Sequence, residues 1–341
     1  MAVIYRNEHS YAGPISMLAK LADGELVIVF REARWRGFVT HGDPTTRASL
    51  LRSGDGGRSW HSLVTPDPAG GNGASIAALA DGTLLVNTFH WRFLPLERAA
   101  ELPTASRREI PRLGLAMALD GVYIARSHTG GYTWSAPARL ELPGVHSLTT
   151  AGRVVELTDG GLLLPLNLRR AEGVSVLPAV ARSRDGGETW ELLAVMGEDA
   201  GRDYHETRIA LLPDGRLLAL HRTADGPFYR SLSADGGARW TPPAPTPLPC
   251  EGSSPADLLV LADGRLLCTY GRRRSPFGVR AAFTTDGGDS WTPEVVLRDD
   301  APDGDMGYPS TVQRDDGALL TACYWHGEDG IRYLEEMTWE A

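Results

Sequence analysis

The chain has 341 residues, 42% of them hydrophobic, and its 39 glycines and 23 prolines are typical of many short strands joined by tight turns. Its formal net charge is −9 and it contains no long run of Lys or Arg, which argues against a nucleic-acid partner. No stretch approaches the ~18 apolar residues of a membrane-spanning helix, and the N-terminal residues contain no apolar leader, so we expect a cytoplasmic protein without a membrane partner.

The cysteines and histidines give no sign of a metal site. Cys250, Cys268 and Cys323 are scattered without a CxxC pair, which favours a reducing compartment and argues against structural zinc. The nine histidines include no pair with HExxH-like spacing. We therefore expect the protein to use no metal and no other cofactor.

An octapeptide, residues 183–190, has the skeleton Ser-x-Asp-x-Gly-x-x-Trp and recurs along the chain. The five copies begin at Ser53, Ser127, Ser183, Ser233 and Thr284. The copy at Ser127 alone has a threonine, Thr129, in place of the aspartate. Ser and Asp side chains bind nearby backbone amides, Gly adopts positive φ, and Trp covers the turn with its large apolar face. We interpret the motif as a hairpin device rather than as a ligand site.

A second pattern, an Asp-Gly pair between two short apolar runs, alternates with the first. The six pairs begin at Asp23, Asp81, Asp159, Asp214, Asp263 and Asp316. Asp-Gly in this context predicts a two-residue hairpin turn with positive φ. Their spacing of about fifty residues is the size of a four-stranded propeller blade. The sequence thus predicts an all-β, six-bladed β-propeller with four-stranded antiparallel blades, as a single domain over residues 1–341.

Two segments depart from this regular spacing. The interval between the second and third hairpins is the longest, which indicates an insertion in the second blade at residues 93–112. This segment is rich in Glu, Arg and Ala, is broken by Pro95, Pro103 and Pro111, and is expected to hold one short helix. A lid, an oligomer contact and a solvated excursion remain open interpretations. The last unit has no octapeptide, so we expect strands at 2–6 and 332–339 to close the ring together.

Propellers bind ligands at one mouth of the channel, so the residues that lead into each hairpin are the candidates for function. In the later blades Glu206 and Tyr308 lie in these segments. Arg222 follows the hairpin of the fourth blade and Arg280 precedes the octapeptide of the fifth, which gives the ordered set Glu206, Arg222, Arg280 and Tyr308. With the recurring octapeptides, this set resembles the exo-sialidase (neuraminidase) superfamily, whose six-bladed propellers carry Asp boxes, also called BNR repeats. The resemblance covers the whole chain.

The resemblance implies roles for individual residues. Tyr308 is expected to be the nucleophile and Glu206 its base, while Asp43 in His41-Gly42-Asp43-Pro44 is the candidate acid/base. Arg222 and Arg280 are expected to bind a substrate carboxylate.

The family's first carboxylate-binding arginine is absent, because the aligned residues are Gly13-Pro14-Ile15-Ser16. Arg31 and Arg34 are the candidate substitutes, with Arg6 as a third.

The chemistry of this set is coherent for a carboxylate-bearing carbohydrate. Arginine forks bind carboxylates bidentately, and a neutral phenol avoids the repulsion that a carboxylate nucleophile would meet. We therefore expect a sialidase-like glycoside hydrolase that removes a terminal acidic sugar with retention. Two alternatives stay open: a polysaccharide lyase that acts on uronates, for which His90 and His205 are available, and a non-catalytic glycan-binding propeller.

Overall fold

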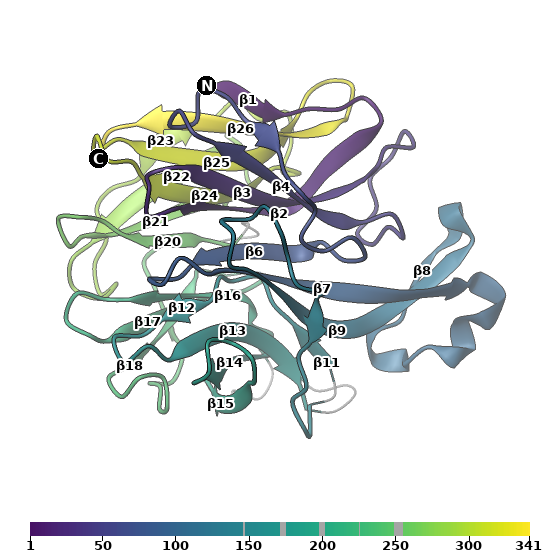
Figure 1. Cartoon of the computed structure of the whole chain (residues 1–341), viewed down its shortest axis with the longest axis horizontal. Helices are drawn as coiled ribbons and strands as arrows, with labels where there is room; N and C mark the ends of the chain where they lie inside the picture. The colour runs from purple at the N-terminus through teal and green to yellow at the C-terminus, as the bar shows by residue number, and fades with distance from the viewer. Residues whose placement is uncertain (146, 171–174, 198–201, 225, 249–254) are drawn as a thin grey trace.

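The computed structural model describes residues 1–145, 147–170, 175–197, 202–224, 226–248 and 255–341; Cys250 lies outside these ranges. Six antiparallel sheets surround a common axis (Figure 1), which confirms the all-β, six-bladed propeller. Each blade is built from four principal strands, and short extra strands join the second and third. In the described part of the chain, no helix is long and apolar enough to cross a bilayer.

The strands follow one another blade by blade along the chain. The first blade comprises β2 (Ser10–Lys20), β3 (Leu26–Arg34), β4 (Arg47–Ser53) and β5 (His61–Ser62). The second comprises β6 (Asn72–Ala78), β7 (Leu84–Pro95), β8 (Arg108–Ile110), β9 (Leu115–Ser127) and β10 (Ala138–Arg139). The third comprises β11 (Ser147–Thr149), β12 (Val155–Glu156), β13 (Leu162–Arg169), β14 (Leu177–Ser183) and β15 (Glu191–Val195). The fourth blade comprises β16 (His205–Leu211), β17 (Leu217–Arg222), β18 (Tyr229–Ser233) and β19 (Ala244–Pro245). The fifth comprises β20 (Asp257–Val260), β21 (Leu266–Arg272), β22 (Gly278–Thr284) and β23 (Val295–Arg298). The sixth comprises β24 (Gly307–Gln313), β25 (Leu319–His326), β26 (Arg332–Trp339) and β1 (Ala2–Tyr5).

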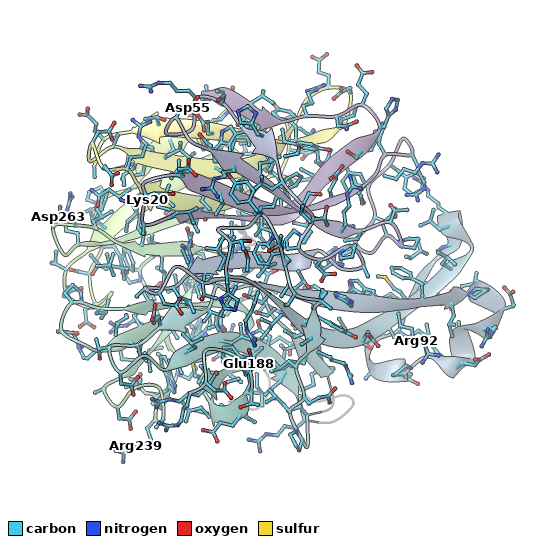
Figure 2. All side chains as sticks on the ribbon, in the orientation of Figure 1. Lys20, Asp55, Arg92, Glu188, Arg239 and Asp263 are labelled. Carbon is cyan, nitrogen blue, oxygen red and sulfur yellow. The ribbon has the colours of Figure 1, made fainter. Side chains whose placement is uncertain are left out.

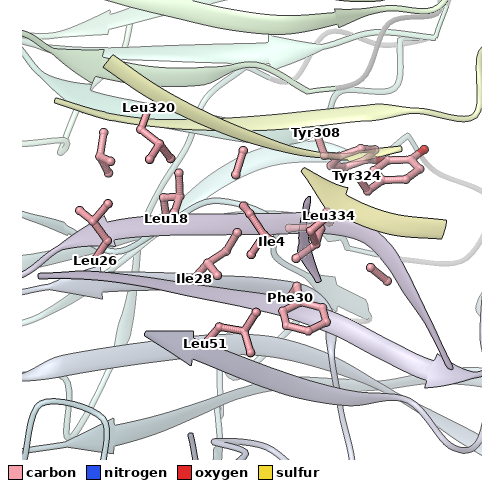
Figure 3. Packing of buried hydrophobic residues seen from close by; sticks show 14 of the residues in the cluster. Ile4, Leu18, Leu26, Ile28, Phe30, Leu51, Tyr308, Leu320, Tyr324 and Leu334 are labelled. Carbon is pink, nitrogen blue, oxygen red and sulfur yellow. The ribbon is translucent and has the colours of Figure 1, made fainter. Parts of the chain in front are cut away.

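The ring closes by pairing the two ends of the chain. Strand β1 lies antiparallel to β26 as the outer strand of the sixth blade, as the sequence predicted. Ile4 packs in one buried cluster with Phe30 of the first blade and Leu334 of the sixth (Figure 3). Several charged side chains, among them Asp263 and Arg239, lie at the outer edge of the molecule in Figure 2. Closure joins the two ends of the chain in one blade, and a propeller leaves only short, protected sheet edges at its channel.

The octapeptides form the turns that their chemistry predicts. In the copy at residues 183–190, Ser183 Oγ accepts the Gly187 amide at 2.8 Å and Asp185 Oδ1 accepts the Thr189 amide at 2.9 Å. Trp190 Nε1 donates to the Gly187 carbonyl at 2.9 Å. In the copy without a carboxylate, Thr129 Oγ1 accepts the Thr133 amide at 2.9 Å. A hydroxyl therefore closes the same turn where the aspartate is missing.

The Asp-Gly hairpins differ from the predicted two-residue turn. In the first, Gly24 N donates to the Leu21 carbonyl at 3.0 Å and Leu21 N donates to the Glu25 carbonyl at 2.8 Å. Gly24 has a positive φ of +86°, whereas the φ of Asp23 is not positive. The loop thus has three residues with only the glycine left-handed, a type I turn followed by a bulge. Asp23 Oδ1 instead accepts the Glu25 amide at 3.1 Å, because an Asp side chain readily caps its own turn.

Residues 93–112 extend the second blade away from the ring, beside label β8 in Figure 1. The chain passes through β7, three 3₁₀ helices (η1, Leu96–Glu101; η2, Thr104–Ser106; η3, Pro111–Leu113) and β8 before it returns in β9. Leu102, Ala116 and Ala118 form a small buried core beneath it. The single short helix that we expected is replaced by 3₁₀ turns, because proline interrupts the backbone hydrogen bonding of a longer helix.

Candidate active site

Three non-glycine residues of the described chain have positive φ, and all three stand at the mouth of the channel. They are Ile15 at +71°, Glu206 at +49° and Tyr308 at +50°. Each lies where the inner strand of its blade loses register with the second strand, in β2, β16 and β24. A side chain in this conformation costs about 1–3 kcal/mol, and such strain gathers at functional sites. The bulges turn Ile15, Glu206 and Tyr308 toward one opening.

These residues line a cavity of about 260 Å³ on that face of the ring. Blades one, two, three, four and six all contribute to its wall. His41, His205 and Trp91 line it together with Glu206 and Tyr308, and so does Arg108 of the extension. The volume is close to the ~300 Å³ at which small-ligand sites begin.

A hydrogen-bonded chain connects Tyr308, Glu206 and Arg222. Tyr308 Oη donates to Glu206 Oε1 at 2.7 Å, and Arg222 Nη1 donates to Glu206 Oε2 at 2.6 Å. Burial alone would raise the pKa of Glu206, but the charge of Arg222 and the bonds from Tyr308 and Arg222 together lower it. Burial and the Glu206 charge raise the pKa of Tyr308. At neutral pH the site therefore holds a neutral phenol against an ionised carboxylate.

The phenol ring of Tyr308 is packed from below and from one side. It belongs to the buried cluster of Ile15 and Tyr324, with 6.0 Å between the centroids of the two tyrosine rings (Figure 3). The Arg273 guanidinium lies 5.4 Å from the centroid of the Tyr308 ring and donates to Tyr324 Oη at 2.6 Å. The ring is thus held rigidly while its hydroxyl reaches the cavity.

Sequence reasoning missed Arg273. Strand β21 ends at Arg272, and Arg273 is the next residue in a run of three arginines, 272–274. Arg222 is the last residue of β17, the corresponding strand of the fourth blade. An arginine run at the end of the second strand was therefore a signal for a cation here, but it did not indicate which of the three lies beside Tyr308.

A second charged group missed from the sequence lies on β16, two residues after Glu206. Arg208, 4% exposed, donates from Nε to the Ala256 carbonyl at 2.9 Å, and burial lowers the pKa of its guanidinium to about 10. Near it, Asp257 accepts Arg153 at 2.9 Å and Ser310 at 3.1 Å. The charges of Glu206 and Tyr308 both act on Arg208. The positive charge of the buried Arg208 guanidinium thus stabilises negative charge at the site.

Asp43, the expected acid/base, is bonded to its own loop. Its carboxylate pairs with Arg36 and accepts the Thr45 amide at 2.8 Å and the Thr45 hydroxyl at 2.6 Å. Asp43 is 2% exposed and lies outside the cavity wall. His41, two residues earlier, is the member of this loop that lines the cavity. Burial and the neighbouring charges of Arg108 and Arg31 lower the pKa of His41.

The remaining predicted arginines do not line the cavity. Arg31, 1% exposed, donates to the Thr40 carbonyl at 3.1 Å. Arg280 donates to the carbonyls of Arg298 and, at 3.2 Å, Pro276, since it lies on the third strand of its blade. Arg34 is exposed at the outer end of β3.

Two further candidates from the sequence are also bound elsewhere. His90 pairs with Asp67 at 2.6 Å and stacks on Tyr123, and Arg6 pairs with Asp329. Of the expected residues, Tyr308 and Glu206 line the cavity and Arg222 binds Glu206, while Asp43, Arg31, Arg34 and Arg280 do not line the cavity. Over the described residues no group of three or more His, Cys, Asp or Glu side chains is placed to bind a metal ion.

Comparison with solved structures finds the same fold in sialidases. A protein of unknown function from Dyadobacter fermentans has a TM-score of 0.86 at 26% identity, over 99% of this chain and 96% of that one. A Hadza microbial sialidase has a TM-score of 0.71 at 18% identity, over 96% of this chain and 65% of its own. The intramolecular trans-sialidase from Ruminococcus gnavus, solved with oseltamivir carboxylate, has a TM-score of 0.66 at 14% identity, over 98% and 97% of the two chains.

Among curated proteins no match is found. The family model for the BNR repeat-like domain matches residues 115–320, more than half of the chain. That range contains four of the five octapeptides and both Glu206 and Tyr308. The chain belongs to the BNR repeat-like family, as a sialidase-like propeller.

Proposed function

We propose that this protein is a retaining glycoside hydrolase that removes a terminal acidic sugar with Tyr308 as nucleophile. The observation that carries the proposal is the 2.7 Å bond from Tyr308 Oη to Glu206 at a cavity wall. Both residues have a strained backbone, so the pair is held in place rather than formed by chance contact. The sialidase fold of the neighbours named above supports the same reaction class.

In the first step Tyr308 attacks the anomeric carbon while its proton passes to Glu206. A free phenol has a pKa near 10, and burial raises it here, so attack requires that proton to leave during the step. The charge of Arg222 on the far carboxylate oxygen and of Arg273 at the ring favours the ionised phenol. The bond to the leaving oxygen breaks as the tyrosyl-sugar bond forms.

We assign proton transfer at the leaving oxygen to His41, because it lines the cavity and Asp43 does not. His41 donates its proton to the departing group and then removes one from the incoming water. Water releases the sugar, and Tyr308 recovers its proton from Glu206. Because the pKa of His41 is lowered, its acid form declines as pH rises through a value below the ordinary ~6.5, so kcat should be highest at acidic pH.

A uronate lyase is the second candidate. His41 and His205 both line the cavity, and burial, as the largest cause, lowers both pKa values and keeps both imidazoles neutral near pH 7. A neutral imidazole can remove the proton alpha to a uronate carboxylate. An unsaturated product that absorbs in the near ultraviolet would identify elimination.

The test is a panel of 4-nitrophenyl glycosides, including uronosides, sialosides and neutral hexosides, with wild type and Tyr308→Phe. We expect wild type to release nitrophenol from at least one acidic glycoside, and Tyr308→Phe to lower kcat by about 10³-fold or more, since the nucleophile is removed. Glu206→Gln should also lower kcat, by at least about 10²-fold. Equal rates for wild type and Tyr308→Phe on every substrate would refute the proposal.

A further inference from the structure

The permanent cations of the cavity wall lie on one side. Among the described residues that line the cavity they are Arg107, Arg108 and Arg169. The first two belong to the extension of the second blade, and the third ends β13 of the third blade. Toward the first blade the wall is Pro14, Ile15 and His41 instead. The arginines of the cavity wall therefore come from blades two and three, and blade one contributes two apolar residues and a histidine.

Arg108 is held in place by the extension. Its backbone pairs with Met117 in the β8–β9 ladder, and its guanidinium lies 5.7 Å from the centroid of the Trp91 ring, which also lines the cavity. Stacking on an aromatic face orders the guanidinium plane without using its hydrogen-bond donors. In the part of the chain that the structure describes, Arg108 has no carboxylate partner. Arg108 is exposed, so its N–H groups are accessible to a ligand in the cavity that it lines.

The extension and the reacting pair face the same space. The loop that carries His41 lies against the extension, because a Cβ at Gly42 would meet Met117 Sδ at 2.2 Å. The charges of Arg108 and of Glu206 both reach His41. Arg108, His41 and Glu206 thus line one cavity, and the first-blade loop that carries His41 lies against β9, the strand that pairs with the extension.

The cations nearest the reacting pair already have partners. Arg222 binds Glu206, and Arg273 binds the Met306 carbonyl at 3.0 Å and Tyr324. Ile15 packs with Tyr308 on its first-blade side. A carboxylate attached directly to the anomeric carbon would have to lie beside Ile15 and beside arginines that already bind protein groups. A carboxylate on the other side of the sugar ring would reach the cationic wall.

We propose that Arg108, stacked on Trp91, is the specificity residue of this site and binds the C6 carboxylate of a hexuronoside whose anomeric carbon faces Tyr308. The inference rests on the proposed hydrolase and goes further by naming the acidic sugar as a uronic acid rather than a 2-keto acid. Arg107 adds positive charge to the same wall, and Arg169, 4.0 Å from Asp203, lies there as well. The extension is then a substrate-binding wall, not a solvated excursion.

The test compares Arg108→Ala with Arg112→Ala, a control on the same extension. Arg112 lies over Phe38 at 5.2 Å and outside the cavity wall. With 4-nitrophenyl hexuronosides, Arg108→Ala should lower kcat/KM by about 10- to 100-fold, the effect of one charge-assisted bidentate contact. The corresponding neutral hexosides should change by less than about threefold, and Arg112→Ala should match wild type on both. Arg108→Lys should recover part of the activity.

A direct binding measurement separates this inference from the proposed hydrolase. Calorimetry with free hexuronate and free hexose is performed on Tyr308→Phe with and without Arg108→Ala. We expect hexuronate to bind more tightly than hexose, and Arg108→Ala to abolish the difference. Equal affinity for the two sugars, or equal loss of kcat/KM on charged and neutral glycosides, would overturn the role of Arg108. Preferred binding of hexuronate without turnover of any glycoside would refute the hydrolase and leave the uronate site standing.

Discussion

At the scale of single residues, the site depends on backbone conformations that Glu and Tyr seldom adopt. Glu206 and Tyr308 have positive φ at matching bulges in the fourth and sixth blades. The strain of about 1–3 kcal/mol each is offset by the ionic and hydrogen bonds that the bulges allow. The sequence indicated both residues as candidates, but the backbone preferences of Glu and Tyr do not predict a positive φ.

Glu206→Gln should change how stability depends on pH. The folded-state pKa of Glu206 is lowered, so its contribution to stability is present above the unfolded value of about 4.3 and is lost as pH falls through the folded value. Near pH 7 the variant should be about 1–3 kcal/mol less stable than wild type, less than for a fully buried pair because about a fifth of each partner is exposed. Below about pH 4 the difference should shrink.

Urea unfolding at several pH values measures this. Glu188→Gln is the control, since Glu188 is 67% exposed beside Arg126 and should change stability by no more than about 0.5 kcal/mol. A pH-independent difference between wild type and Glu206→Gln would contradict the lowered pKa.

At the scale of elements, the octapeptide turns and the extension have different roles, the first in stability and the second in the cavity wall. The turns connect the outer strands of the first five blades, and their hydrogen bonds close locally, within four residues. The extension is held by a small core and by the β8–β9 ladder, and it forms one wall of the cavity. Turns of this kind contribute to stability, and the extension contributes to the site.

Ser183→Ala should destabilise the protein by about 1–3 kcal/mol, because the buried Gly187 amide loses its acceptor and Ser183 is 1% exposed. Chemical denaturation reports the free energy of unfolding. Thr189→Ala in the same turn is exposed and keeps its backbone bond to Asp185, so it should cost no more than about 0.5 kcal/mol. Equal effects of the two substitutions would show that the buried amide is not what the serine stabilises.

At the scale of the whole molecule, the candidate site depends on a closed ring. Glu206 and Tyr308 are 102 positions apart, and they meet because the fourth and sixth blades share one channel mouth. The first blade, which supplies Ile15, packs against the sixth. Any change that opens the ring should therefore affect the site as well as stability.

Removal of residues 1–5 tests this dependence. It exposes the edge of β26 and removes Ile4 from the core, so we expect a loss of at least about 3 kcal/mol and a tendency to aggregate through the open edge. Light scattering and denaturant midpoints measure both effects. A closer control is Val3→Ala, at an exposed position of the same strand, which should keep the wild-type midpoint to within about 0.5 kcal/mol.

The repeats by themselves determined the propeller, because each octapeptide and each Asp-Gly hairpin specifies its turn through contacts a few residues apart. They also placed Glu206, Arg222 and Tyr308 at corresponding positions of their blades. The interaction of those three side chains, like the all-β architecture, follows from position within a repeating unit.

Only the tertiary structure decided the rest of the site. Arg280 lies on an outer strand and Arg273 lies at Tyr308, because the strand that carries a residue sets its distance from the channel. Asp43 is bonded to Arg36 within its loop, which leaves His41 at the cavity. Arg108 reaches the cavity because the extension folds back along β9. These outcomes depend on contacts between segments far apart in the chain, and local residue patterns do not predict such contacts.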